Sequence, residues 1–482
     1  MRLKNLLQGV NVLSSNVDME LEIGSVAYDS REVVPGGLFV AISGFASDGN
    51  RFIPMAMGKG AAVVVTAKNP GEDVPYVLVE DDRLALALIG CNFYGHPAKD
   101  MTLIGVTGTN GKTSVTWLLK QVLEQVTGAK AGLIGTMENR IGDEVIPTER
   151  TTPESFQLQG LFARMRSAGC RYAIMEVSSH AIALHRVGGV RFDVAAFTNL
   201  TEDHLDFHKT MEHYCDTKAE LFSRCDKAVL NADDSWFDRI GAKAACPVIT
   251  TAVKGAGTVR ATEVELLSDG VKFLAVCGEE QAKIQVPIPG RFTVYNVLTV
   301  LGIVKALGIS LAEAAKALTA VQGVKGRVEV VPTPGKPYTV LIDYAHTPDG
   351  LDNVLRSVRD YCKGRLICVF GCGGDRDPIK RPIMGRIGVE LSDIAIITSD
   401  NPRTEAPDKI IADIVAGVNP AMGNYEIIEN RVEAIGYAMD IGEKDDIIIL
   451  AGKGHETYQE ICGVKHHLDE REEVAARLME KR

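Results

Sequence analysis

The stretch Gly105-Val106-Thr107-Gly108-Thr109-Asn110-Gly111-Lys112-Thr113 decides the fold class of this chain. It follows an apolar run at 102–106 and precedes a helical pattern, so it reads as a glycine-rich turn between a strand and a helix. The glycines allow close approach of the backbone to phosphate groups, Lys112 can reach the β- and γ-phosphates of a nucleotide, and Thr113 can bind Mg²⁺. The stretch therefore predicts a phosphate-binding loop on a parallel sheet.

The loop departs from the usual G-x-x-x-x-G-K-[ST] form, because Val106 stands at the first glycine position. The residues alone also allow a glycine turn capped by a threonine. The strand before the loop and the helix after it favour the phosphate-binding interpretation.

Length and composition predict a globular protein of three domains. The chain has 482 residues, of which 46% are hydrophobic and 24% are charged, and domains average about 150 residues. Breaks at His96-Pro97 and at 323–326 place the domains at 1–98, 99–326 and 327–482. Strand–turn–helix alternation from Met101 predicts an α/β fold, with an antiparallel stretch at 258–289.

Bulk properties exclude several classes of function. No apolar run approaches the ~20 residues that cross a bilayer, and the first residues lack a secretory signal. The ten cysteines form no C-x-x-C pair, and the net charge of −11 argues against binding to nucleic acid. We expect a cytoplasmic monomer whose partners are small molecules.

Three further residues could complete a metal centre beside the loop. Glu176 ends an apolar run, and His204 and Lys218 follow a second run at 194–198. A carboxylate and an imidazole suit divalent metals, whereas a protonated lysine has no lone pair to donate. From the residue alone, Lys218 is expected to be a solvated helical lysine.

Four strings together resemble the Mur ligases, which form amide bonds at the expense of ATP in peptidoglycan synthesis. The strings are Thr107 to Thr113, Glu176-Val177-Ser178-Ser179-His180, Thr198-Asn199-Leu200 with Asp203-His204-Leu205-Asp206, and Asp343-Tyr344-Ala345-His346-Thr347-Pro348. The resemblance runs through essentially the whole chain. It implies a central P-loop domain with a parallel sheet, flanked by an N-terminal α/β domain that binds UDP and a C-terminal Rossmann-like domain.

The resemblance also implies the residues at the nucleotide and metal. Lys218 would be carbamylated (N6-carboxylysine), which turns a cation into an anionic oxygen ligand. Glu176 and His204 would share Mg²⁺ with it, and Thr113 would bind a second ion on the ATP phosphates. The implied ATP contacts are Gly108, Thr109, Asn110, Gly111, Lys112, Thr113, Ser114, Asn296, Arg327 and Asp343, and the implied catalytic residues are Lys112, Glu176, His204 and Lys218.

Two further motifs, Asp29-Ser30-Arg31 and Asp400-Asn401-Pro402-Arg403, resemble the family members that add meso-diaminopimelate to UDP-N-acetylmuramoyl-L-alanyl-D-glutamate. For the UDP-linked substrate the implied contacts are Ser30, Thr151, Thr152, Ser178 and Arg186. Thr152-Pro153-Glu154 also reads as a helix start, whose free N–H groups suit an anion. Leu184 and Phe45-Ala46 depart from the family pattern near this substrate.

For diaminopimelate, the implied contacts are Arg376, Asp400, Asn401, Pro402, Arg403, Gly452 and Glu456. An arginine can grip a carboxylate with two hydrogen bonds, while a carboxylate receives the distal ammonium, so Arg403 and Glu456 are complementary anchors. In isolation, Asp-Asn-Pro-Arg is also an ordinary turn after a strand.

The expected reaction is ATP-dependent amide formation through an acyl phosphate, with Mg²⁺ and ATP required. Two alternatives stay open from the sequence. One is the same ligase with L-lysine as the added amino acid. The other is a P-loop switch that hydrolyses ATP without making an amide.

Overall fold

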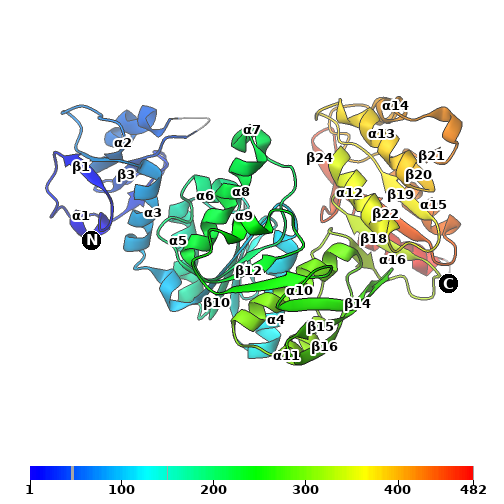
Figure 1. Cartoon of the computed structure of the whole chain (residues 1–482). Helices are drawn as coiled ribbons and strands as arrows, with labels where there is room; N and C mark the ends of the chain where they lie inside the picture. Colours follow the sequence, from blue (N-terminus) through cyan, green and yellow to red (C-terminus); the bar gives the residue numbers. More distant parts are fainter. Residues whose placement is uncertain (45–47, 149, 481–482) are drawn as a thin grey trace. The chain divides into compact units, whose positions relative to one another are not determined.

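The computed structural model describes residues 1–44, 48–148 and 150–480 as a mixed α/β protein (Figure 1). It divides into two compact units, one of residues 1–259 and 299–309 and the other of residues 260–298 and 310–482. The large parallel sheets confirm the predicted fold class, while the three domain boundaries stay a prediction. No helix in the described part of the chain is both long and apolar enough to span a membrane. Phe45 and Ala46 lie outside the described residues.

The first sheet belongs to the N-terminal part of the first unit, in the order β1-β5-β4-β3-β2. Strands β2 to β5 are parallel, and β1 is antiparallel to β5. The capping carboxylate of Asp81 starts the long helix α3 by accepting from the N–H groups of Arg83 and Leu84. The bounds are α1 Leu3–Leu6, β1 Val12–Ser15, β2 Val26–Ala27, β3 Leu38–Ala41, α2 Ile53–Gly58, β4 Val63–Thr66, β5 Tyr76–Val79 and α3 Asp82–Phe93.

The central sheet of the same unit carries the phosphate loop. Its strands follow the order β13-β12-β11-β6-β10-β7-β8-β9, and β13 to β7 are parallel. The bounds are β6 Thr102–Thr107, α4 Lys112–Thr127, β7 Ala131–Ile134, β8 Asn139–Ile141, β9 Glu144–Ile146, α5 Ser155–Ser167, β10 Tyr172–Glu176, α6 Ser179–Ala183, β11 Phe192–Phe197, α7 Leu205–His208, α8 Met211–Ala219, β12 Cys225–Asn231, α9 Phe237–Gly241 and β13 Val248–Ala252.

The predicted antiparallel stretch is confirmed as a three-stranded meander. Strand β14 (Val259–Leu267) pairs with β15 (Gly270–Cys277), which pairs with β16 (Glu280–Val286). Helices α10 (Arg291–Ala306) and α11 (Leu311–Leu318) follow. Ser310 and Glu313 form a capping box that fixes the start of α11.

The last sheet lies wholly in the second unit, in the order β17-β18-β22-β19-β20-β21. All its neighbouring strands are parallel except β17 and β18. The bounds are β17 Glu329–Val331, β18 Thr339–Asp343, α12 Pro348–Arg359, β19 Leu366–Phe370, α13 Lys380–Leu391, β20 Ile394–Ile397, α14 Pro407–Val415, β21 Tyr425–Ile427, α15 Arg431–Ile441, β22 Ile447–Ala451, β23 Tyr458–Ile461, β24 Val464–His467 and α16 Glu470–Glu480.

Strand β22 shows why this sheet needs continuous apolar runs. Ile447 and Ile449 pack with α12, α13 and α14 on one face, while Ile448 and Leu450 pack with α15 and α16 on the other (Figure 1). Successive side chains of a strand point to opposite faces, so a strand covered on both faces must be apolar throughout. The polar residues that follow the parallel strands therefore gather at the carboxyl edge of the sheet, where ligands of such folds bind.

Candidate functional site

The phosphate loop connects β6 to α4 as predicted. Gly108 and Gly111 both have positive φ angles, and Gly111 is the N-cap residue of α4. A Cβ atom at Gly108 would collide with the hydroxyl of Thr198, so the loop requires glycine there. The 16-residue helix α4 directs its free N–H groups toward this loop, which is the arrangement that binds phosphate.

The segment after β11 holds the loop in shape. Asn199 accepts hydrogen bonds from the backbone N–H groups of Thr109 (2.8 Å) and Asn110 (3.0 Å). The Thr198 hydroxyl donates to the carbonyl of Asn110 at 2.6 Å. The Thr-Asn pair of the sequence motif is therefore a support for the loop backbone.

Lys218 is buried, which contradicts its interpretation as a solvated helical lysine. The residue is 1% exposed on α8, and its Nζ lies over the ring of Tyr214. Nζ donates to the carbonyl oxygen of Gly108 (2.9 Å), which also accepts from Nζ of Lys112 (2.9 Å). Burial, followed by the nearby charge of Lys112, holds the pKa of Lys218 well below its ordinary value.

The low pKa of Lys218 fits the carbamate that the sequence resemblance implies. Carbamate forms when an unprotonated amine attacks carbon dioxide, so burial beside a second cation favours the reactive form. A protonated lysine could not bind a metal, because it has no lone pair to donate. The described part of the chain contains no cluster of three His, Cys, Asp or Glu side chains that could hold a metal ion.

Glu176 and His204 occupy different environments. Glu176 is buried at the end of β10, where it accepts from the backbone N–H and the hydroxyl of Thr136. Gly135 leaves room for this carboxylate, because a Cβ atom there would collide with Glu176 Oε1. His204 is half-exposed before α7, with its ring 4.9 Å from the ring of His180. Burial, followed by the charge of His204, lowers the pKa of His180.

Four of the five residues predicted for the UDP-linked substrate lie together. The Thr152 hydroxyl donates to the carbonyl of Glu176 at 2.9 Å and accepts from the N–H of Ser178. Arg186 Nη1 donates to the carbonyl of Thr152, and Thr136 joins the hydroxyl of Thr151 to Glu176. This network connects the predicted substrate contacts to a predicted metal ligand.

Ser30, the fifth of these residues, has a separate environment, since it is buried and its hydroxyl donates to Met55 Sδ. The helix start expected at Thr152-Pro153 lies further along, because α5 begins at Ser155. Glu154 has extended backbone angles and caps α5 by accepting from the N–H of Ser155.

Glu154 is surrounded by guanidinium groups. Its Oε2 lies 3.4 Å from Arg83, 3.6 Å from Arg150 and 3.6 Å from Arg186. One buried carboxylate beside three arginines leaves a local excess of positive charge. Burial is the main cause that lowers the pKa of Arg186, and an anionic substrate group would relieve this crowding.

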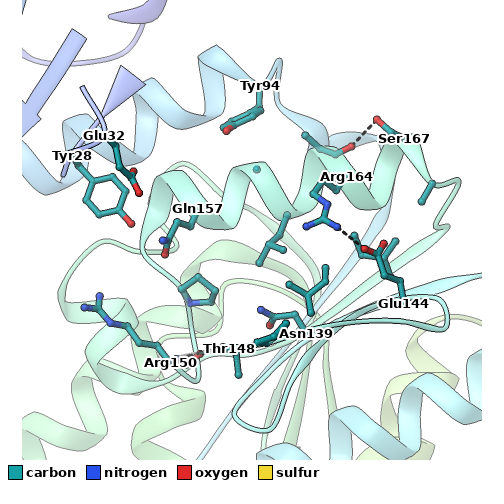
Figure 2. A pocket seen from close by; sticks show the side chains of 18 of the residues that line it. Tyr28, Glu32, Tyr94, Asn139, Glu144, Thr148, Arg150, Gln157, Arg164 and Ser167 are labelled. Carbon is teal, nitrogen blue, oxygen red and sulfur yellow. Dashed lines mark hydrogen bonds and ion pairs between the residues drawn. The ribbon is translucent and has the colours of Figure 1, made fainter. Parts of the chain in front are cut away.

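A cavity of about 1220 Å³ adjoins these segments (Figure 2). Tyr28, Asp29 and Arg31 line it from the N-terminal part, and Arg150, Gln157 and Arg164 line it from the loop before α5 and from α5 itself. The lining includes sequence neighbours of Ser30 and Thr152 but neither of those two residues. The cavity therefore lies beside the predicted substrate contacts.

Three predicted ATP contacts belong to the second unit. Asn296 is buried on α10, and Arg327 is exposed with its guanidinium over the ring of Tyr344. Asp343 accepts from the backbone N–H groups of Val328 (2.8 Å) and Ala345 (2.9 Å). Burial raises the pKa of Asp343 despite these bonds. The carboxylate of Asp343 therefore organises the backbone around the start of the C-terminal sheet.

The residues predicted for diaminopimelate converge at the carboxyl edge of the C-terminal sheet. Asp400 and Asn401 follow β20 and are buried, and Gly452 follows β22. A Cβ atom at Gly452 would lie 2.7 Å from Asp400 Oδ2, and its φ of +116° also favours glycine. Asn401 Nδ2 donates to Glu456 Oε2 at 2.8 Å.

Arg403 is held in the same pocket by its backbone and its side chain. Its φ is +51°, an angle uncommon for a residue with a side chain. Its Nη1 donates to the carbonyl of Gly374 (2.7 Å), and its Nε lies 3.3 Å from Glu460 Oε2. The next residues of that glycine loop include Arg376, which is exposed.

Sequence reasoning missed two buried cations around this pocket. Arg381 is 2% exposed and binds Glu405 and Asp413, which fixes the glycine loop. This pairing lowers the pKa of Glu405 to about 2. Lys453 is fully buried between Gly452 and Gly454. A lysine between glycines directly after an apolar strand was the signal that could have identified it.

Comparisons with known proteins agree along the whole chain. Family models match residues 22–94 (Mur ligase family, catalytic domain), 106–304 (Mur ligase middle domain) and 326–454 (Mur ligase, glutamate ligase domain). A protein of Caldanaerobacter subterraneus subsp. tengcongensis is 48% identical over 100% of this chain and 99% of its own length. One of Clostridium tetani is 47% identical over 98% of each chain. Both are named UDP-N-acetylmuramoyl-L-alanyl-D-glutamate--2,6-diaminopimelate ligase.

A solved structure with the same protein name is 28% identical to this chain. Its TM-score is 0.79, and the match covers 100% of this chain and 99% of the other. The similarity therefore extends over the whole length of the chain.

Proposed function

The chain belongs to the Mur ligase family, and from this premise we propose that it joins meso-2,6-diaminopimelate to the D-glutamate side-chain carboxylate of UDP-N-acetylmuramoyl-L-alanyl-D-glutamate. The observation that carries the proposal is that one chain combines a phosphate loop whose Gly108 carbonyl receives two lysines with a cluster after β20 and β22, in which Asn401 binds Glu456 and Arg403 lies two residues further along. The names of relatives that match nearly the full chain support the same substrates.

Activation of the carboxylate comes first. The γ-phosphoryl group of ATP moves to the carboxylate, so the bond from phosphorus to the β–γ bridging oxygen breaks, an acyl phosphate forms and ADP leaves. Lys112 and the N–H groups of α4 neutralise the phosphate charge during transfer. One Mg²⁺ would be held by Glu176, His204 and carbamylated Lys218 and a second by Thr113, and both would supply further neutralisation.

The amine of diaminopimelate then attacks the acyl carbon. A C–N bond forms, the C–O bond to phosphate breaks, and the amine nitrogen loses one proton. We assign Arg403 to a carboxylate of the amino acid and Glu456 to its distal ammonium. Thr151, Thr152, Ser178 and Arg186 orient the UDP-linked substrate, and Arg186 supplies positive charge beside Glu154.

Phosphate release with each amine tests this function. We expect release that requires the UDP-linked dipeptide and is much faster with diaminopimelate than with L-lysine, which lacks the carboxylate that Arg403 would bind. Faster release with lysine would favour the lysine ligase. Release from ATP alone at the full rate would favour a P-loop switch.

A further inference from the structure

The buried side chain of Lys453 contacts two residues that are predicted to bind the amino acid. It is 0% exposed, and its backbone lies between Gly452 and Gly454, directly after β22. Its Nζ donates to Asn401 Oδ1 at 3.1 Å and lies 3.4 Å from Glu456 Oε2. Glu456 is the residue that the proposed function assigns to the distal ammonium, and Asn401 is another contact that the sequence predicts for diaminopimelate.

These three side chains form a closed triangle of polar contacts. Asn401 Nδ2 donates to Glu456 Oε2 at 2.8 Å, so the same oxygen receives both Asn401 and Lys453. The backbone N–H of Glu460 also donates to Asn401 Oδ1, at 2.9 Å. Each member of the triangle therefore restricts the other two.

The triangle fixes the orientation of the Asn401 amide. Oδ1 faces two donors, the Lys453 ammonium and the Glu460 N–H. Turning the amide over would place its NH₂ group against both donors and its oxygen against the Glu456 carboxylate. Without the Lys453 ammonium, only the Glu460 N–H would remain as a donor to Asn401 Oδ1.

The triangle also orients the Glu456 carboxylate. Both contacts fall on Oε2, and Oε1 takes part in neither. Glu456 is 17% exposed, so it is accessible at the edge of the buried cluster. A carboxylate held through one oxygen presents the other in a fixed direction, which suits a single ammonium group.

We propose that Lys453 is a positioning residue that orients Asn401 and Glu456 for the distal ammonium of the diamino acid. The inference rests on the proposed function, since it concerns the same pocket. Lys453 is too deeply buried to contact the substrate, so it acts through its two neighbours. It therefore determines selectivity for the second amine.

The test compares two amino acids that differ only in that amine. 2-Aminopimelate has the attacking amine and both carboxylates of diaminopimelate but lacks the distal amine. The ratio of kcat/KM for diaminopimelate to that for 2-aminopimelate therefore measures recognition of the distal ammonium. We expect Lys453→Met to lower this ratio at least tenfold, mainly through KM for diaminopimelate, with KM for ATP unchanged.

Arg365→Met is the matched control. Arg365 binds the buried carboxylate of Asp446 at 2.7 Å, and these two residues precede β19 and β22 at the amino edge of the same sheet. Loss of Arg365 leaves the buried carboxylate of Asp446 without its ion-pair partner, at the edge of the sheet opposite Asn401 and Glu456. We expect a lower unfolding temperature for Arg365→Met and an unchanged substrate ratio.

The outcomes separate the inference from the proposed function. A Lys453→Met protein that loses kcat/KM equally for both amino acids would show a structural role only and overturn the inference. If Lys453→Met does not fold, the ratio is measured for Lys453→Arg, whose planar group cannot occupy the position of one ammonium, and an unchanged ratio overturns the inference. A wild-type protein that uses neither amino acid would instead refute the proposed function.

Discussion

Lys218 in the first unit and Lys453 in the second are both almost completely buried, and their surroundings are opposite. Lys218 meets a backbone carbonyl and a tyrosine ring, with Lys112 at the same carbonyl, and none of the described carboxylates forms an ion pair with it. Lys453 meets an amide oxygen and the carboxylate of Glu456. Burial alone therefore does not define the role of a lysine. Burial and then the charge of Lys112 lower the pKa of Lys218, whereas Lys453 is held in place by an amide oxygen and a carboxylate.

Removing Lys218 should have the largest effect and tests the first half of this comparison. We expect Lys218→Ala to lower kcat by at least about 100-fold, because the proposed metal ligand and a support of the phosphate loop are lost together. Short carboxylic acids should restore part of the activity by replacing the carbamate. The measurement is phosphate release with saturating substrates.

Lys243→Ala serves as its control, since Lys243 is exposed in the same unit. Its rate should match the wild type. Full activity in Lys218→Ala would contradict the proposed role of a carbamate at Lys218.

Changing Arg403 tests its assignment to a carboxylate of diaminopimelate. Asn is the appropriate replacement, because it tolerates the positive φ of this position better than alanine does. We expect KM for diaminopimelate to rise roughly 10- to 100-fold, since a hydrogen bond to a charged group contributes about 1.5–3 kcal/mol. KM for L-lysine should change little, and equal changes for both amines would contradict the assignment of Arg403 to the far carboxylate.

Thr152→Val tests the network that joins the UDP-linked substrate to Glu176. The change removes the hydrogen bonds to the Glu176 carbonyl and from the Ser178 N–H. Each bond contributes about 0.5–1.5 kcal/mol, so we expect KM for the UDP-linked dipeptide to rise roughly 2- to 12-fold for each bond that is lost, with KM for diaminopimelate unchanged. A rise in KM for diaminopimelate alone would contradict the assignment of Thr152 to the UDP-linked substrate.

The smallest effect is on stability, and it sharpens the contrast between the two lysines. The pKa of Lys218 is lower in the folded than in the unfolded chain, so folding releases a proton and stability falls as pH drops below the ordinary lysine pKa of about 10.4. In buffer free of carbon dioxide, Lys218→Met should therefore stabilise the protein more at pH 7 than at pH 9. The limiting slope is about 1.4 kcal/mol per pH unit.

Thermal unfolding at the two pH values measures this difference, and Lys243→Met gives the baseline. A difference between Lys218→Met and wild type that does not vary with pH would show that Lys218 keeps an ordinary pKa in the fold.

The sequence predicted what depends on local pattern. The apolar runs at 102–106 and 194–198 correspond to β6 and β11, and the loop from Gly108 to Thr113 lies before α4 as expected. Buried parallel strands and glycine turns follow from neighbouring residues, so a single chain is enough to find them.

Burial of single charges could not be predicted in the same way. Lys218 lies on a polar helix, and it is buried against the phosphate loop, whose Gly108 is 110 residues earlier in the chain. Lys453 depends on Asn401, 52 residues away. The start of α5 was also misplaced, because Pro153 fits a helix start but the Glu154 side chain caps the helix at Ser155.

Mass spectrometry of the product tests the central claim most directly. The wild-type protein is incubated with ATP, Mg²⁺, the UDP-linked dipeptide and equal amounts of diaminopimelate and L-lysine. The account predicts one new species, heavier than the dipeptide by diaminopimelate less water, with one ADP formed per product. A product carrying lysine, or ADP without any joined product, would contradict it.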